Sequence, residues 1–254
     1  MIGRNLSQLY RWPRRAILAI FGIPDIMVRY KWRILWRELK TIPQDRRVRM
    51  LDAGCGAGSW SLEIARRRPN WEIVGIDLSG DGIRTAEKNA KILGVKNCSF
   101  EQVDFLNYTG DPERKFDLVL SVSSFHYLFE NGMGSELTRR VSEWVRPGGI
   151  LLFMGPRRSE ETHFRKAFKK DKWHSVFSRK ELEDITANSG FSIVKLRPEM
   201  FLFATWIKEN RELFVDKKLL FKALFPLNFL LYLLDPLNKS RKLSMMWILM
   251  AKKD

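Results

Sequence analysis

Apolar runs of strand length alternate with amphipathic stretches through the middle of the chain. The apolar runs occupy residues 48–51, 72–76, 98–105, 116–124, 150–154 and 191–196. Between them, apolar residues recur every three or four positions, which predicts helices over 79–93, 134–145 and 178–189. This alternation predicts an α/β domain whose sheet is mostly parallel and covered by helices on both faces.

Local signals place the ends of several elements. Ser79 is an N-cap for the helix that follows the second strand. Ser178 and Glu181 have the spacing of a capping box, and Gly190 ends the helix they begin. Residues 244–252 form a last apolar strand.

A glycine-rich turn follows the first strand. Val48, Met50 and Leu51 lead to Asp52, and glycines stand at 54, 56 and 58 before an amphipathic helix. Glycines allow positive φ and let a ligand approach the backbone, so this order is typical of nucleoside or phosphate binding. A P-loop would need G-K-[ST], which is missing, and the dinucleotide fingerprint would need glycine where Ser59 stands.

Acidic residues lie at the ends of the first three strands, at Asp52, Asp77 and Asp104. Asp77 follows the glycines by about 20 residues, which places it to accept hydrogen bonds from ribose hydroxyls, as in dinucleotide enzymes. Each residue alone could serve in a cap or a turn. Three at successive strand ends favour a nucleoside site, without choosing its cofactor.

The pattern L-D-x-G-C-G-x-G over 51–58, with R-P-G-G at 146–149, resembles the class I S-adenosylmethionine-dependent methyltransferases, in particular their type 11-like small-molecule enzymes. The resemblance is close over 48–154 and looser over 178–200. It implies a Rossmann-like sheet of seven strands with the last one antiparallel, S-adenosylmethionine as cofactor, and Asp104 at the adenine amino group. The cofactor-binding residues it implies are Asp52, Gly54, Cys55, Gly56, Gly58, Asp77, Leu78, Asp104, Phe105 and Ser121.

Methyl transfer from a sulfonium mainly requires that acceptor and methyl group be aligned and water excluded. A base helps when the acceptor is a phenol or hydroxyl, and His126, after the fourth strand, is the candidate. Its alternative role is packing against the cofactor. His163 and His174 are weaker candidates, because both lie in a basic insertion over 155–177.

The cysteines and the residues after the fourth strand exclude some chemistries. Cys55 and Cys98 cannot form a disulfide framework and have no metal-type spacing, so we expect no metal and a reducing compartment. Cys55 is a small residue that fits the turn rather than a nucleophile. The Asn/Asp-Pro-Pro-Tyr/Phe motif of many enzymes that methylate nucleic-acid amino groups is absent, which argues against a base-amine substrate.

The net charge of +16 is concentrated in the flanks. Residues 1–49 carry 12 basic and 3 acidic side chains, residues 50–154 carry 12 and 14, and residues 155–254 carry 21 and 12. The basic excess favours an anionic partner, either a membrane surface or nucleic acid. A solvated basic face is the plainer alternative.

The N-terminal flank contains an amphipathic helical pattern from residue 25. Val28, Trp32, Leu35 and Leu39 share one face, and arginines recur every four residues on another. Such a helix could lie in a membrane interface, pack over the core, or cover the cofactor.

The C-terminal flank contains 16 mostly apolar residues over 219–234, between Lys217-Lys218 and a basic group at 239–242. A membrane span needs ~20 residues, so this segment is either a hairpin that dips into one leaflet or a lid.

These features divide the chain into a basic helical extension (1–47), a methyltransferase core (48–200), a hydrophobic and basic insertion (201–243) and a final core strand (244–254). The leading hypothesis is methyl transfer to a small hydrophobic or lipid-like acceptor, such as a quinol or isoprenoid compound. The enzyme would be cytoplasmic and peripheral on the inner face of a membrane, bound through 10–40 and 217–242. The alternatives are an RNA or protein methyltransferase, with less support, and a non-enzymatic scaffold; the oligomeric state stays open.

Overall fold

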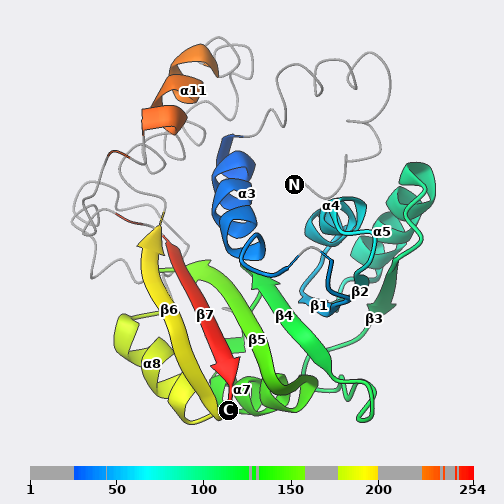
Figure 1. Cartoon of the computed structure of the whole chain (residues 1–254), viewed down its shortest axis with the longest axis vertical. Helices are drawn as coiled ribbons and strands as arrows, with labels where there is room; N and C mark the ends of the chain where they lie inside the picture. Colours follow the sequence, from blue (N-terminus) through cyan, green and yellow to red (C-terminus); the bar gives the residue numbers. More distant parts are fainter. Residues whose placement is uncertain are drawn as a thin grey trace.

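A computed structural model of the chain describes a single sheet with helices on both faces (Figure 1). The described residues are 26–43, 45–125, 128–129, 132–157, 177–199, 225–234, 237, 244 and 246–254. Four predictions lie largely or wholly outside them: the structure of residues 1–25, the basic insertion over 155–177, most of the insertion over 201–243, and the roles of His126, His163 and His174.

The sheet has seven strands in the order β3-β2-β1-β4-β5-β7-β6. The first five pair in parallel, and β7 runs antiparallel to both β5 and β6, as predicted. The order reverses between β1 and β4, where open α/β sheets bind ligands at their carboxyl ends. The strands are β1 (Arg49–Ala53), β2 (Glu72–Asp77), β3 (Cys98–Gln102), β4 (Phe116–Val122), β5 (Val145–Pro156), β6 (Phe191–Glu199) and β7 (Met246–Lys253).

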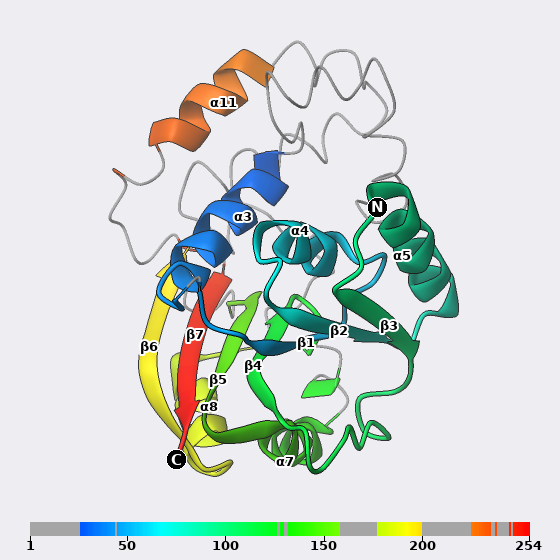
Figure 2. The same ribbon diagram turned by 45° about the vertical axis from the view of Figure 1, so that its right-hand side comes forward.

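Alternate strand residues point to the two faces of the sheet and build two apolar cores. Helices α3 (Ile26–Leu39), α4 (Ser59–Arg67) and α5 (Gly80–Leu93) lie on one side, with α11 (Phe225–Leu234) beyond α3 (Figure 2). Helices α7 (Gly134–Trp144) and α8 (Arg179–Ala187) cover the other face.

The local signals for helix ends are confirmed. Ser79 accepts a hydrogen bond from the Gly82 N–H at the start of α5. Ser178 and Glu181 form both hydrogen bonds of a capping box, and Gly190 follows α8 with φ of 69°.

Some predicted bounds were wrong. The third strand ends at Gln102 rather than Phe105, so Asp104 lies in the following turn. The fifth strand begins at Val145, before the predicted turn. The ladder with β4 shifts register there, because Val145 pairs with Phe116 while Ile150 pairs with Leu118, and the extra residues bulge out.

The apolar face of α3 packs on the protein. Leu35 and Leu39 are buried in the core shared with β1, β4 and β7, and Val28 is buried as well. The ring of Trp32 lies tilted against Trp60 of α4, with ring centroids 4.9 Å apart. The prediction that 10–40 meets a membrane is therefore wrong for the apolar face of residues 28–39. The apolar side chains of α3 pack against the sheet instead.

A buried carboxylate ties α3 to the far edge of the sheet. Glu38 is fully buried, and Lys195 Nζ of β6 lies 2.5 Å from its Oε2. Arg197 of β6 and Arg37 pair with its other oxygen. Burial raises the pKa of Glu38, but hydrogen bonds from Lys195 and Arg37 outweigh it and hold the pKa below its ordinary value.

We predict that Glu38→Gln lowers the free energy of unfolding at pH 7 by about 2 kcal/mol, because three cations lose their shared anion. The lowered pKa means that this contribution is present above the ordinary carboxyl pKa and disappears as pH falls through the folded value. Urea denaturation measures both effects. Glu63→Gln, which removes ion pairs at the surface of α4, is the matched control and should cost about 0.5 kcal/mol or less; equal losses would contradict the prediction.

Candidate active site

The glycine turn leaves β1 in a backbone conformation that glycine permits. Gly54, Gly56 and Gly58 have φ of 85°, 54° and 75°. The N–H groups of Gly54 and Cys55 both donate to Ile76 O of β2, at 2.8 and 3.0 Å. The turn is therefore held against the neighbouring strand before any ligand binds.

The three glycines have different neighbours. A Cβ on Gly54 would lie 2.2 Å from Ser124, and one on Gly58 would lie 2.9 Å from Phe100. A Cβ on Gly56 would meet nothing within 4 Å. Gly54 and Gly58 thus serve packing, whereas Gly56 faces open space where a ligand can approach the backbone.

Asp52 is fully buried at the end of β1. Ser61 of α4 donates a hydrogen bond to its Oδ2, while Oδ1 is buried without a partner among the described residues. Burial raises the pKa of Asp52 to about 6 despite the Ser61 hydrogen bond. An orphaned carboxylate oxygen beside a nucleoside-type turn calls for a cationic ligand group.

Asp77 connects the turn to the next helix. One carboxylate oxygen accepts from the Gly56 N–H at 2.8 Å, and the other accepts from the Ser79 N–H at 2.9 Å. The adjacent Leu78 is 66% exposed and presents an apolar surface beside the cradle, by which we mean the glycine turn over 54–58 together with Asp52, Asp77 and Asp104. Each oxygen of Asp77 accepts one N–H and keeps capacity for a further hydrogen bond, and the roles of Asp77 and Leu78 in cofactor binding stay predictions.

Asp104 and Phe105 follow β3 at the same edge of the sheet. The Leu106 N–H donates to Asp104 Oδ1 at 2.8 Å, which closes a turn. Phe105 packs edge-on against Phe125 with ring centroids 5.5 Å apart. The structure thus brings the ends of β1, β2, β3 and β4 to the edge of the sheet that holds the glycine turn.

Ser121 and Cys55 are buried next to the glycine turn rather than exposed to a ligand. Ser121 is fully buried, and its hydroxyl lies 2.7 Å from that of Ser124, which donates to Ala53 O at 2.7 Å. Ser121 therefore supports the exit of β1 through Ser124. Cys55 is buried, which raises the pKa of its thiol, so it stays a neutral side chain.

Two residues at this edge escaped the sequence analysis. Ser123 has φ of 57° and is the one non-glycine residue with positive φ in the described chain. Lys31 of α3 donates to its hydroxyl at 3.0 Å. The basic periodicity of residues 29–37 hinted at a charged face, but no local signal could tell that Lys31 reaches β4.

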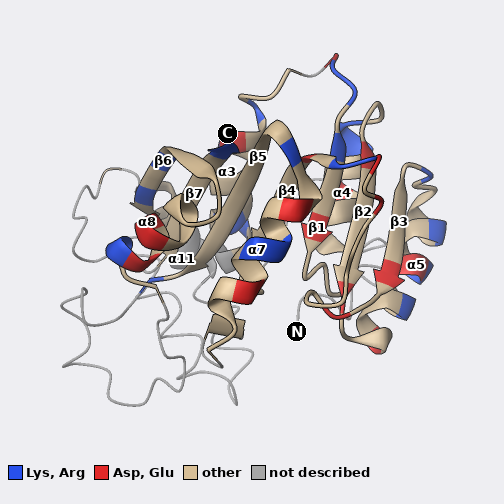
Figure 3. Cartoon of the chain, turned by 90° about the horizontal axis from the view of Figure 1, so that it is seen from below, with Lys and Arg blue, Asp and Glu red and all other residues tan. Residues whose placement is uncertain are grey.

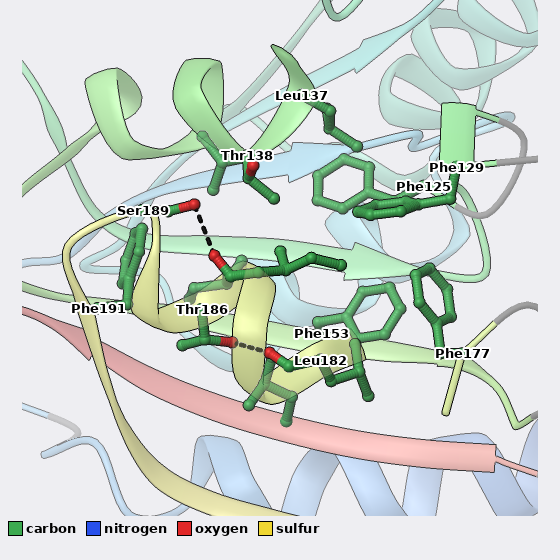
Figure 4. Close-up of a pocket in the computed structure, with 14 residues that line it drawn as sticks. Phe125, Phe129, Leu137, Thr138, Phe153, Phe177, Leu182, Thr186, Ser189 and Phe191 are labelled. Carbon is green, nitrogen blue, oxygen red and sulfur yellow. Dashed lines mark hydrogen bonds between the residues drawn. The ribbon is translucent and has the colours of Figure 1, made fainter. Parts of the chain in front are cut away.

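An apolar cavity of about 40 Å³ lies behind the edge, between α7, α8 and β5 (Figure 4). Phe125 and Phe129 form one end of it. The hydroxyls of Thr138, Thr186 and Ser189 donate to backbone carbonyls of α7 and α8, so the cavity presents apolar groups. It offers nothing to orient a reacting atom, and the candidate centre is the strand edge.

The strand order and the glycine turn define the class of Rossmann-like methyltransferases. Residues 44–195 match a family described as a methyltransferase domain. The chain is 28% identical over 160 residues to a malonyl-[acyl-carrier protein] O-methyltransferase of Paenibacillus, covering 58% of this chain and 56% of that protein. It is 28% identical over 134 residues to a ubiquinone biosynthesis O-methyltransferase of Azorhizobium caulinodans, covering 51% and 47%.

Among solved structures, a Haemonchus contortus phosphoethanolamine N-methyltransferase in complex with S-adenosylmethionine has the same fold. Its TM-score is 0.61 at 18% identity, covering 99% of this chain and 60% of that one. The chain spans about half the length of the two curated relatives named above, and less of several others.

The chain belongs to the family of S-adenosylmethionine-dependent methyltransferase domains. The residues present fit that cofactor. Gly56 leaves room for a nucleoside, and the partnerless oxygen of Asp52 suits a cationic amino group. Among the described residues, no group of acidic, histidine or cysteine side chains could hold a metal ion.

We predict that Asp52→Asn weakens the binding of S-adenosylhomocysteine about tenfold or more at pH 7.5, because a charged partner of the ligand is lost. Wild-type affinity should fall as pH drops through about 6, where Asp52 becomes protonated, while the variant stays flat. Calorimetry at several pH values measures this.

Asp52→Asn should weaken ligand binding but increase the stability of the unliganded protein. Because the folded pKa of Asp52 lies above its unfolded value, its contribution is full below pH 3.8 and is lost as pH rises through about 6. Asp52→Asn should therefore stabilise the unliganded protein at pH 7.5. An asparagine variant with unchanged affinity at every pH would remove Asp52 from the site.

We predict that Gly56→Ala weakens S-adenosylhomocysteine binding by about tenfold or more, because the added methyl enters the space where the ligand meets the backbone. Gly94→Ala is the control, since Gly94 ends α5 with φ of 65° and a Cβ there also meets nothing within 4 Å. Both variants should lose about 1 kcal/mol of stability to backbone strain. Equal calorimetric affinities for the two would argue against the cradle.

Proposed function

We propose that this protein transfers a methyl group from S-adenosylmethionine to a small hydrophobic or lipid-like acceptor, such as a quinol or isoprenoid compound, at a membrane surface. The observation that carries the membrane part is an exposed leucine stripe on and just after α11. Leu230, Leu233, Leu234 and Leu237 are 51%, 53%, 37% and 75% exposed. On α11, the spacings of three and four put Leu230, Leu233 and Leu234 on one side of the helix, and Leu237 follows the helix.

The opposite side of α11 is anchored to α3. Tyr232 meets Tyr30 edge-on with ring centroids 4.9 Å apart, and Arg33 donates to Tyr232 O at 3.0 Å. Figures 1 and 2 place α11 beyond α3, on the side toward which β4 and β5 run. The stripe therefore faces outward near the edge that holds the candidate active site.

The sequence around α11 supports an anionic membrane as the partner. Basic residues at 217, 218, 222, 239, 241 and 242 flank the apolar segment, although they lie outside the described residues. No helix in the described ranges combines the length and hydrophobicity that a membrane crossing needs. Apolar anchoring plus basic shoulders would supply the two attachment signals that stable surface binding requires.

The chemistry follows from the site. The bound cofactor supplies a methyl group on a positively charged sulfur. The glycine turn, Asp52 and Asp77 would hold the cofactor, and the ends of β4 and β5 would orient the acceptor and exclude water. His126 stays the proposed base for a phenolic acceptor. Relatives named for O-methylation of malonyl-[acyl-carrier protein] and in ubiquinone biosynthesis support a small acceptor.

A nucleic-acid substrate has less support. On α7, Glu136 and Glu143 pair with Arg139 and Arg140, so charges of both signs interleave on that helix (Figure 3). A polymer-binding surface needs a continuous basic patch, and α7 does not offer one.

We predict that the protein co-sediments with vesicles of three parts phosphatidylcholine to one part phosphatidylglycerol, and that Leu230→Glu with Leu233→Glu reduces the bound fraction at least about tenfold. The matched control is Ile92→Glu on α5, because Ile92 is 51% exposed, like Leu230, but lies on another helix. Vesicle binding that survives the double substitution would refute the role of the stripe.

The activity itself is tested by mass spectrometry of lipid extracts from cells with and without the gene. We expect a species that is lighter by one methylene when the gene is absent. Accumulation of an undermethylated RNA with unchanged lipids would favour the polymer substrate instead.

A further inference from the structure

Lys31 places a cation at the carboxyl end of β4. This lysine lies on α3, and its Nζ donates to Ser123 Oγ at 3.0 Å. Ser123 is the first residue after β4. A contact between residues 92 positions apart fixes where this ammonium group lies.

A backbone hydrogen bond to β5 holds Ser123 in place. Its N–H donates to Met154 O of β5 at 2.8 Å, and its φ of 57° is a conformation that non-glycine residues rarely adopt. Strained residues of this kind persist where the surrounding structure enforces them, often at functional sites. Here the strain lets two consecutive serines serve different partners, Ser123 toward Lys31 and Ser124 toward the glycine turn.

The position of this pair favours the acceptor over the cofactor. The cofactor cradle is built from the ends of β1, β2 and β3, at Gly56, Asp77 and Asp104. Ser123 directly follows β4 and bonds to β5, and both strands lie beyond β1 in the strand order, away from β2 and β3. A ligand group that meets Lys31 there would sit beyond the cradle.

The charge of Lys31 then selects the acceptor. The reactive sulfur of the cofactor is already cationic, so a second cation nearby disfavours a positively charged acceptor and stabilises an anionic one. We propose that Lys31, positioned by Ser123, binds an acidic oxygen of the acceptor, so that the methyl group goes to a carboxylate or phenolate. This inference rests on the proposed function and narrows its acceptor.

The bonds and electrons of the transfer balance. The acceptor oxygen forms a bond to the methyl carbon as the bond from that carbon to sulfur breaks, and the electron pair of the broken bond stays on sulfur. A carboxylate oxygen enters without a proton, whereas a phenol first gives its proton to the base and then enters as phenolate. Its negative charge and the positive charge of the sulfonium both disappear, and the product loses its attraction to Lys31.

The first arm of the experiment asks whether Lys31 instead holds the carboxylate of the cofactor. Calorimetry compares S-adenosylhomocysteine with methylthioadenosine, which lacks that carboxylate, on wild type and Lys31→Met. If Lys31 serves the acceptor, the substitution changes both affinities by less than about twofold. A selective loss of at least about tenfold for S-adenosylhomocysteine would assign Lys31 to the cofactor and overturn the proposal.

The second arm uses decanoate and decanol, which share a chain and differ in the charge of the head group, on protein saturated with S-adenosylhomocysteine. We expect wild type to bind decanoate at least about tenfold tighter than decanol, since the ammonium group makes a charge-assisted hydrogen bond. Lys31→Met should abolish that preference and Lys31→Arg should keep it. Lys40→Met, which removes an exposed lysine just after α3, should also keep the preference for decanoate. This control shows that the preference does not come from the overall positive charge of the protein.

Equal affinities for decanoate and decanol in wild type, or no binding of either, would overturn the inference. So would a preference that survives Lys31→Met. These outcomes are separate from failure of the proposed function, which would show as loss of vesicle binding or of S-adenosylhomocysteine binding in wild type.

Discussion

The candidate site depends on how the glycine turn is held in place where the chain leaves β1. β2 holds this exit from one side, where Ile76 O receives two N–H groups and the Asp77 carboxylate receives the Gly56 N–H. β4 holds it from the other side, where the Ser124 hydroxyl bonds to Ala53 O. Ordering a loop with three positive-φ glycines costs conformational entropy. Because these contacts order the loop when the protein folds, the cost does not fall on ligand binding. The cradle is consequently preorganised at the point where the strand order reverses.

Much of this could be predicted from the sequence, because the signals are local. Strand runs, the glycine spacing, the Ser79 cap and the Ser178–Glu181 capping box all depend on residues within a few positions of one another. The family resemblance then supplied the number of strands and the antiparallel last strand, which no local signal contains, whereas the strand order was not predicted. The bounds of β3 and β5 were missed, because a turn at Asp104 and a register shift beside Phe116 depend on neighbouring strands.

The contacts that could not be predicted join residues far apart in the chain. The amphipathic pattern of α3 fits a membrane, a core or a lid equally well, and the choice is made by the sheet that buries its apolar face and by the partners of Glu38 on β6. One helix thereby combines three connections: Glu38 to the sheet edge, Lys31 to β4, and Tyr30 with Arg33 to α11. Helix α3 therefore contacts both α11, which carries the leucine stripe, and the end of β4 at the candidate active site.

The central claim is that the turn and the three aspartates around it form a site for an adenosyl sulfonium. Titration calorimetry of the wild-type protein against S-adenosylhomocysteine, NAD and FAD tests it most directly. The account predicts one S-adenosylhomocysteine per chain and no measurable heat of binding for either dinucleotide. Saturable binding of NAD or FAD, with none of S-adenosylhomocysteine, would contradict it.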